Sequence, residues 1–225
     1  MKLSNETLAV LKNFSTINQN LEFKKGNKIS TMSASKTILA QAVLKDTFDE
    51  SFCVYDLNDF LSVMSLYKDS VELDFDDANV IFKSGRRKTE FRKTEKSNIV
   101  TPAADKQIRL VDPEVVFTLT AEDYADVMKS ASVLSSPHIA IQSDGDKVYI
   151  VTYDASDSSQ HTNRIEVSGV EGTGRSYSAV FRTENIKMIP GEYAVQVSFK
   201  GFAHFKNTKE DIEYWIAIEA KESKF

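Results

Sequence analysis

Cysteine, glycine and proline are all scarce in this chain of 225 residues. It contains 1 cysteine, 8 glycines and 4 prolines. The single cysteine, Cys53, cannot form an internal disulfide, so cysteine usage gives no sign of a secreted, disulfide-stapled scaffold. Few glycines and prolines predict a chain of mostly regular helices and strands joined by short turns.

Long apolar runs are also missing. No stretch approaches the roughly 20 apolar residues of a membrane-spanning helix, and residues Met1–Glu6 lack the apolar segment of a signal peptide. We therefore expect a protein of the cell interior without membrane contacts. Hydrophobic residues make up 41% of the chain, which supports real cores and excludes wholesale disorder.

The charges nearly balance, with 28 Lys and Arg against 33 Asp and Glu and a net charge of −5. This argues against a protein that coats nucleic acid with most of its surface, yet it allows a local basic stripe. Lysines lie on or beside the polar faces of the expected helices: Lys2, Lys12, Lys68, Lys129 and Lys187. From the residues alone, such lysines either attract phosphates or only keep helices soluble.

Hydrophobic spacing predicts an order of helix, strands, helix and strands that occurs twice. Helices are expected at Leu3–Ile17, Leu57–Tyr67, Ala121–Leu134 and, briefly, after Thr183. Their expected N-caps are Ser4, Asp56, Thr120 and Thr183, and the third helix is expected to bury Ala121, Tyr124, Ala125, Met128 and Ala131. The fold class is therefore α+β, a duplication of two sheet-rich domains with two helices each, at residues 1–110 and 111–225.

Catalytic and metal-binding constellations are poorly supported. The histidines are His138, His161 and His204, and none lies near Cys53 or another candidate nucleophile in sequence. Residues Asp74–Asp77 lack the glycine and distal glutamate of a calcium loop and are expected to form a hairpin turn. Residues Gly172–Arg175 lack the strand and helix that a phosphate-binding loop needs. We expect no enzyme activity, no cofactor and no metal.

A second basic cluster spans an expected strand at the end of the first domain. It contains Arg86-Arg87-Lys88, Arg92-Lys93 and Lys96, interrupted by Glu90 and Glu95. Alternating charge of this kind either protects an edge strand from aggregation or forms one side of a subunit interface. The pattern alone does not separate the two.

Several segments, collinear over the whole chain, resemble the sliding clamps of T-even-type bacteriophages. The matching segments are Met1–Ser4, Leu11–Asn18, Tyr55–Leu61, Pro102–Asp105, Ala121–Asp123 and Lys187–Gly191. Residues Lys83–Ile99 and Gly169–Tyr177 depart from the family's pattern.

The resemblance implies a non-enzymatic, homotrimeric ring of two-domain subunits. Such a ring encircles duplex DNA without sequence preference, tethers the replicative DNA polymerase and is opened by an ATP-dependent clamp loader. It also implies help with phage late transcription and a place in the cytoplasm of the infected bacterial host. The alternative is a non-catalytic phage structural or assembly subunit; an enzyme with an unrecognised site is a third class.

Position by position, the resemblance also implies three sets of site residues. The helix lysines (Lys2, Lys12, Lys68, Lys129 and Lys187) become the DNA-facing set. A pocket for partner peptides is implied at Met32, Leu39, Leu110, Trp215 and Ala217. The subunit interface is implied between Lys88–Thr94 and Thr162–Val167 of the next subunit. Phe91 is expected to face Ile165 and either Arg92 or Lys93 to face Glu166, with Val167 also in the interface.

Overall fold

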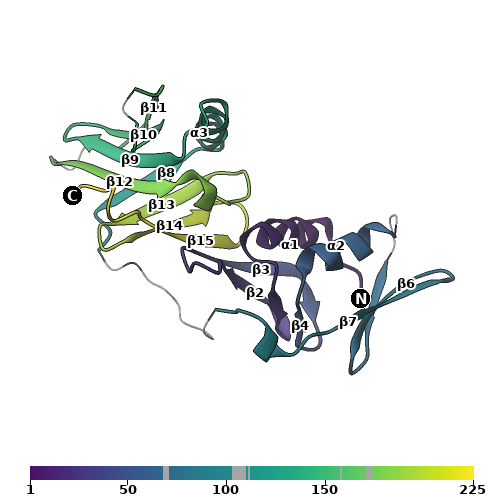
Figure 1. Cartoon of the computed structure of the whole chain (residues 1–225). Coiled ribbons are helices and arrows are strands. Elements are labelled where there is room, and N and C mark those ends of the chain that lie inside the picture. The colour runs from purple at the N-terminus through teal and green to yellow at the C-terminus, as the bar shows by residue number, and fades with distance from the viewer. Residues whose placement is uncertain (68–70, 103–109, 111, 158, 171–173) are drawn as a thin grey trace. The chain divides into compact units, whose positions relative to one another are not determined.

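The computed structural model describes residues 1–225 apart from 68–70, 103–109, 111, 158 and 171–173. Its contacts divide the chain into unit 1, Met1–Asp105, and unit 2, Lys106–Phe225 (Figure 1). The expected boundary at residues 110 and 111 lies close to this division and stays a prediction. Each unit is described below by itself.

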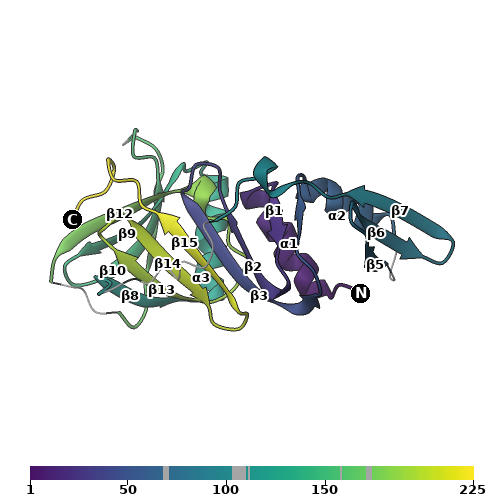
Figure 2. The ribbon, with the colours of Figure 1, turned by 90° about the horizontal axis from the view of Figure 1, so that it is seen from below.

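Unit 1 consists of two α-helices and three groups of paired strands. The helices are α1 (Asn5–Ile17) and α2 (Leu57–Ser65), and the strands are β1 (Leu21–Phe23), β2 (Gly26–Met32), β3 (Ile38–Phe48), β4 (Phe52–Val54), β5 (Glu72–Phe75), β6 (Asn79–Ser84) and β7 (Arg87–Arg92). β1 pairs with β4, β2 with β3, and β5, β6 and β7 form an antiparallel sheet in that order. α1 packs on β3 and against α2, and the β5-β6-β7 sheet extends past α2 (Figure 2).

Local sequence signals explain where these helices begin. The Ser4 side chain accepts a hydrogen bond from the backbone N–H of Thr7, and Asp56 accepts from those of Asn58 and Asp59. Each thus satisfies backbone donors that the first helical turn leaves without partners. Both expected N-caps are confirmed. The core beneath the helices is aromatic, with Phe23 stacked on Phe52 at 4.5 Å between ring centroids.

Unit 2 repeats the plan with one α-helix. It contains β8 (Val115–Leu119), α3 (Ala121–Val133), β9 (His138–Asp144), β10 (Val148–Tyr153), β11 (Asn163–Glu166), β12 (Ser176–Arg182), β13 (Tyr193–Ser198), β14 (Phe202–Asn207) and β15 (Ile212–Ala217). These strands form two antiparallel groups. One has the strand order β11-β10-β9-β12, and the other has the order β15-β14-β13-β8. α3 packs on β10 and β11. Thr120 caps it as expected, accepting from Asp123 N at 3.0 Å.

The expected fourth helix is wrong, because only a 3-10 turn, Thr183–Asn185, forms there. Pro190 restricts Ile189 to extended backbone and forbids a helical bond to the Ile186 carbonyl. The segment is held instead by tyrosines: Tyr124 Oη donates to the Met188 carbonyl at 2.9 Å, and Tyr193 Oη donates to that of Ile189. Burial raises the pKa of Tyr193 to about 12, so its hydroxyl stays a donor at neutral pH.

Both ends of the described chain cover an outer sheet edge. Met1 exchanges backbone hydrogen bonds with Leu73 of β5, where Leu73 N donates to Met1 O at 2.7 Å. Lys224 forms an antiparallel bridge with Ser178 of β12, and the ring of Phe225 stacks on Phe199 at 4.3 Å. The β5-β6-β7 and β11-β10-β9-β12 sheets are therefore each covered at one edge.

Candidate nucleic-acid, subunit and partner sites

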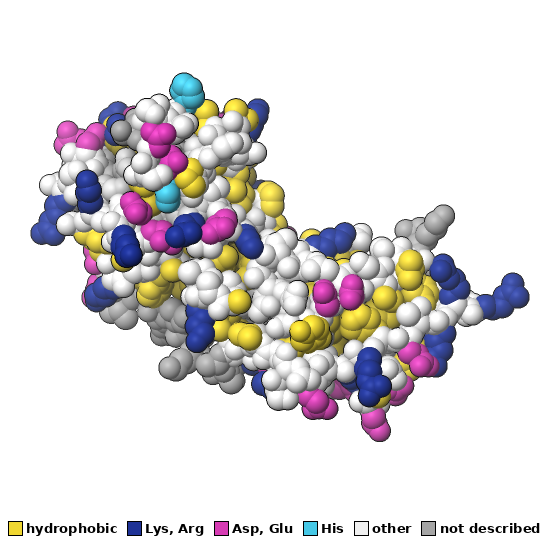
Figure 3. All heavy atoms as spheres, in the orientation of Figure 1, with side chains coloured by type: hydrophobic (Ala, Val, Ile, Leu, Met, Phe, Trp, Pro, Cys, Tyr) yellow, Lys and Arg dark blue, Asp and Glu magenta, His cyan; other side chains and the backbone are white. Residues whose placement is uncertain are grey.

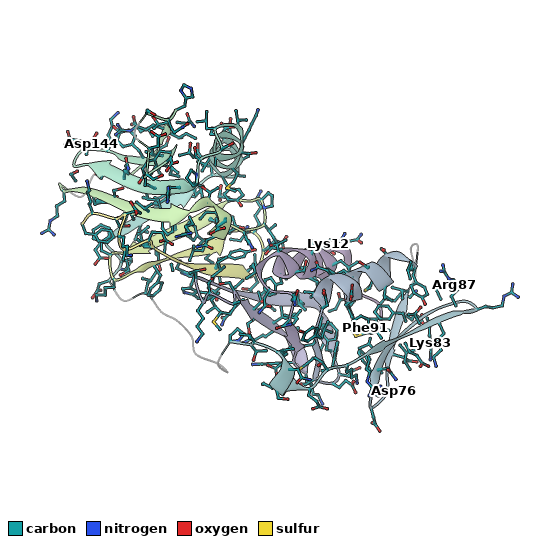
Figure 4. The ribbon with its side chains drawn as sticks, in the orientation of Figure 1. Lys12, Asp76, Lys83, Arg87, Phe91 and Asp144 are labelled. Carbon is teal, nitrogen blue, oxygen red and sulfur yellow. The ribbon has the colours of Figure 1, made fainter. Side chains whose placement is uncertain are left out.

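Helix α1 presents Lys12 on its solvent face. Its buried residues are Thr7, Leu11, Phe14 and Ile17, a spacing that turns the opposite face outward. Lys12 is exposed on that face with Ala9 and Thr16, and Figure 4 labels it on unit 1. Its ammonium makes no ion pair with any residue the structure describes. The charge of Lys12 is available to a phosphate.

Helix α3 exposes Lys129, but its rotation differs from the expected one. The helix buries Tyr124, Val127 and Ala131, while Ala121 and Ala125 are exposed and Met128 is half-buried. Val127 replaces Met128 in the buried stripe because i, i+3 and i+7 positions share one face. The exposed face carries Glu122 and Asp126 as well as Lys129, so its charge is mixed. Acidic residues near the first turn are stabilised by the helix dipole.

The remaining expected DNA-facing lysines differ in setting. Lys2 Nζ lies 3.8 Å from Glu72, and both side chains are mostly exposed, so the pair is weak. Lys187 is half-buried and follows the 3-10 turn, so it does not lie on a helix as expected. Lys68 lies outside the described residues. The DNA-facing role of the whole set stays a prediction.

β2 and β8 pair with no strand on their outer sides in the described part of the chain. The same is true of one strand in each of the two sheets that a chain end covers at the other edge. In unit 1 this strand is β7, which pairs only with β6. In unit 2 it is β11, which pairs only with β10. An edge of this kind offers backbone donors and acceptors to another chain.

The side chains of β7 alternate between the core and the solvent. Phe91 is half-buried, and its ring lies 5.5 Å from that of Phe60 in α2 (Figure 4). Arg92 is exposed. Lys93 turns inward: its side chain is 14% exposed, pairs with Glu50 at 2.5 Å and lies 5.9 Å from the Phe52 ring centre. Its charge is therefore neutralised within unit 1.

The side chains near β11 are also engaged. Glu166 pairs with Lys147 at 2.8 Å, and the Arg164 guanidinium lies over the Tyr149 ring at 3.3 Å. Ile165 is half-buried and Val167 is buried. Of the two residues expected to face Glu166, Arg92 or Lys93, contact with Lys93 would require Lys93 and Glu166 to give up these partners. The apolar residues and the backbone edge remain for contact with another chain.

The expected pocket residues occupy particular positions in each unit. In unit 1, Met32 and Leu39 are register partners at the end of the β2–β3 hairpin, and both are half-buried. In unit 2, Trp215 and Ala217 lie on the same face of β15, and Leu110 is half-buried before β8. Their role as a pocket stays a prediction.

Trp215 has a polar neighbour that the sequence did not indicate. His204 Nε2 lies 2.9 Å from Glu213 Oε2, and the imidazole stacks on the indole at 4.7 Å. Burial lowers the pKa of His204 below its usual value, and the bond to Glu213 opposes that shift. Trp215 is 6% exposed, and its Nε1 donor has no hydrogen-bond partner among the residues described. The register pair His204 and Trp215 brings them together, which a sequence pattern does not predict.

The other chemistry-bearing residues have structural settings. His138 Nδ1 accepts a hydrogen bond from Ala155 N at 3.1 Å, and burial raises the pKa of the Cys53 thiol. Asp76 accepts from the N–H groups of Ala78 and Asn79, which confirms the hairpin turn expected there. The residues described contain no group of three or more His, Cys, Asp or Glu placed to hold a metal ion, and none of their helices is long and apolar enough to cross a membrane. Residues 171–173 of the glycine-containing loop lie outside the description.

Comparison with known proteins gives the same fold and family at every level. Residues 4–101 match the family "DNA polymerase processivity factor", and residues 116–220 match "gp45 sliding clamp, C terminal". The sliding clamp of Escherichia phage RB69 is 31% identical over 98% of this chain and 97% of its own. The sliding clamp of Vibrio phage KVP40 is 32% identical over 98% of this chain and 100% of its own.

The fold extends to clamps with much less similar sequences. The crystal structure of the PCNA2-PCNA3 complex from Sulfolobus tokodaii superposes with a TM-score of 0.68 at 14% identity, covering 97% of this chain and 98% of that one. The duplicated α+β fold expected from the sequence is therefore confirmed. The chain belongs to the family of phage sliding clamps, the processivity factors of DNA polymerase.

Proposed function

We propose that three copies of this chain close into a ring around duplex DNA and tether the replicative polymerase to it. The supporting observation is that β7 in unit 1 and β11 in unit 2 are each unpaired on one side, in sheets whose opposite edge is covered by a chain end. Pairing between two different edges assembles subunits head to tail, and such an assembly closes when its rotation allows. The ring acts by enclosing DNA and performs no chemistry itself.

The proposed junction joins β7 of one subunit to β11 of the next. Backbone hydrogen bonds between the two edges would continue the sheet, and Phe91 and Ile165 would continue the apolar layer beneath it. Because Lys93 and Glu166 already have partners within their own units, we propose that Arg92 makes the polar contact and that Val167 only supports the strand.

Two residues that sequence reasoning missed belong to the same proposed junction. Leu66 at the end of α2 is 53% exposed, and its carbonyl accepts from Arg87 of β7. Val133 at the end of α3 is 75% exposed, and Ser130 of the same helix bonds Asn163 of β11 at 2.8 Å. Pairing the two strands would therefore bring the two helix ends together and bury both side chains. The available signal in the sequence was an aliphatic residue at the end of each expected helix.

DNA would lie against the solvent faces of the helices. The expected lysines would attract phosphates without reading the base sequence: Lys12 and Lys129 on the helices, together with Lys2, Lys68 and Lys187. Such contacts are exchangeable, so the ring would slide. The mixed charge of α3 would keep the attraction weak.

We propose further that partner peptides dock at the Trp215 side of the second unit, with Met32, Leu39, Leu110 and Ala217 as further contacts. Trp215 is a large aromatic residue stacked on His204, and residues of this kind commonly anchor a docked peptide. The polymerase, an ATP-dependent clamp loader and late-transcription factors would share this site in the cytoplasm of the infected host.

The first test is absolute mass by light scattering over a wide concentration range at low and moderate salt. A species at three times 25.3 kDa, about 76 kDa, is expected. Loaded protein should then stay on circular DNA and leave linear DNA through its ends. A monomer at every concentration would contradict the ring, and equal loss from both DNAs would contradict encirclement.

A further inference from the structure

The turn between β6 and β7 gathers positive charge in a chain whose net charge is −5. Ser84 and Arg87 are the last register partners, so Gly85 and Arg86 form a two-residue turn. Gly85 has φ +56°, which glycine adopts without strain at the first position of such a turn. Figure 3 shows Lys and Arg side chains gathered at this end of unit 1.

Three of the four cations around the turn have partners within unit 1. Lys83 pairs with Asp74 at 2.7 Å, and Lys88 pairs with Glu90 at 2.5 Å. Arg87 donates to the Leu66 carbonyl at 3.0 Å. Arg86 is exposed, and its guanidinium makes no bond with the residues that the structure describes. Among these four cations, Arg86 is the one whose side chain has no bonding partner in the described part of the chain.

The turn is fixed to the end of α2. Besides its bond to Leu66, the Arg87 guanidinium lies 5.4 Å from the Tyr67 ring centre. The Tyr67 hydroxyl shares a hydrogen bond with Thr89 Oγ1 at 2.7 Å and donates to the Phe82 carbonyl at 3.3 Å. A cation at a helix C-terminus is also favoured by the helix dipole. These contacts hold Arg86 just beyond a helix end, and Figure 4 labels Arg87 and Lys83 there.

We infer that Arg86 is an additional contact for the phosphates of duplex DNA. This inference rests on the proposed function, in which the helices of unit 1 face the DNA. A guanidinium binds a phosphate through two parallel hydrogen bonds and needs no particular base.

Charge complementarity favours DNA over an acidic surface of a neighbouring copy. The acidic groups next to β11, the edge proposed to meet β7, are already paired: Glu166 with Lys147 at 2.8 Å and Asp144 with Arg164 at 3.5 Å. A phosphate backbone carries unpaired charge at every nucleotide.

The test compares wild type with Arg86→Ala and Arg86→Lys, using Lys209→Ala as the control for loss of an exposed charge elsewhere. Binding of the intact protein to a fluorescein-labelled 30-base-pair duplex is measured by anisotropy at several salt concentrations. Each lost phosphate contact lowers the slope of log K against log salt by about 0.9. Arg86→Ala should lower it by about 1 to 3 per trimer, while Arg86→Lys and Lys209→Ala should keep it.

Two results would overturn the inference. One is an Arg86→Ala slope equal to wild type. The other is a loss of trimer mass in Arg86→Ala, which would place Arg86 at a subunit contact. Failure of the proposed function is distinguishable, because wild type itself would then show no trimer or no retention on circular DNA.

Discussion

The imidazole of His204 lies nearly parallel to the indole of Trp215, at 15° between planes and 4.7 Å between centroids. The two residues face each other across β14 and β15. Because Trp215 is the only tryptophan in the chain, its emission reports directly on this neighbour and on the proposed peptide site.

Acidification should change that emission and reduce stability. Burial is the main cause that lowers the pKa of His204; Lys206 acts in the same direction, and Glu213 opposes both. Neutral His204 therefore contributes its full share to the free energy of unfolding above the pKa of an unfolded histidine, about 6.5. That share is lost as pH falls through the lower pKa of His204 in the folded protein. Fluorescence titrations and urea unfolding at several pH values would measure it. A His204→Gln variant should remove this transition, and an unchanged transition would assign it to another group.

Trp215→Phe should cost less stability than Trp215→Ala. Nε1 of Trp215 has no hydrogen-bond partner among the described residues, so Trp215→Phe loses no bond. Trp215→Ala should cost about 3–5 kcal/mol through the cavity it leaves. We expect Trp215→Phe to remain folded but to stimulate the cognate polymerase less than wild type does. Full stimulation by the phenylalanine variant would mean that the indole has no specific role in docking.

A negative charge introduced into β11 should prevent the trimer from forming. Ile165→Asp places a carboxylate where the apolar layer is proposed to continue, so light scattering should give a mass of 25.3 kDa. Phe91→Asp should do the same, but its contacts with Phe60 and Phe82 make that variant less stable. Circular dichroism separates dissociation from unfolding. A folded Ile165→Asp trimer would show that β11 is not the contact strand.

Reversing two helix charges should weaken DNA binding and spare assembly. In the double variant Lys12→Glu and Lys129→Glu, the slope of log K against log salt should fall while the oligomer mass stays the same. A matched double variant at Lys28 and Lys209, which are also exposed, serves as the control. Equal losses in both double variants would remove the argument for a DNA-facing helix surface.

Tyr124→Phe should destabilise unit 2 by about 1–3 kcal/mol, because the buried Met188 carbonyl loses its donor. Tyr149→Phe is the matched change: its exposed hydroxyl bonds Asp144 at 3.1 Å and should matter far less. Urea unfolding of both variants measures the difference. Equal effects would mean that the Met188 segment finds another donor.

Local signals in the sequence predicted the helix starts, because a cap such as Ser4 or Asp56 acts within one turn. The turn at Asp76 was predictable for the same reason. The setting of Lys93 was not, since its partner Glu50 is 43 residues away and only the folded sheet brings them together. Lys187 was misplaced because tyrosines from distant elements determine the conformation after the 3-10 turn.

The covered outer edges of β5 and β12 limit how many neighbours one subunit can have. Met1 occupies the first edge and Lys224 the second, so each of these sheets keeps one open side in the described chain. Within these two sheets β7 and β11 are left for pairing with another copy, so strand pairing through them joins each subunit to two neighbours. Shielding the β5 and β12 edges would thus keep these two sheets from adding further neighbours, whatever the number of subunits in the finished assembly.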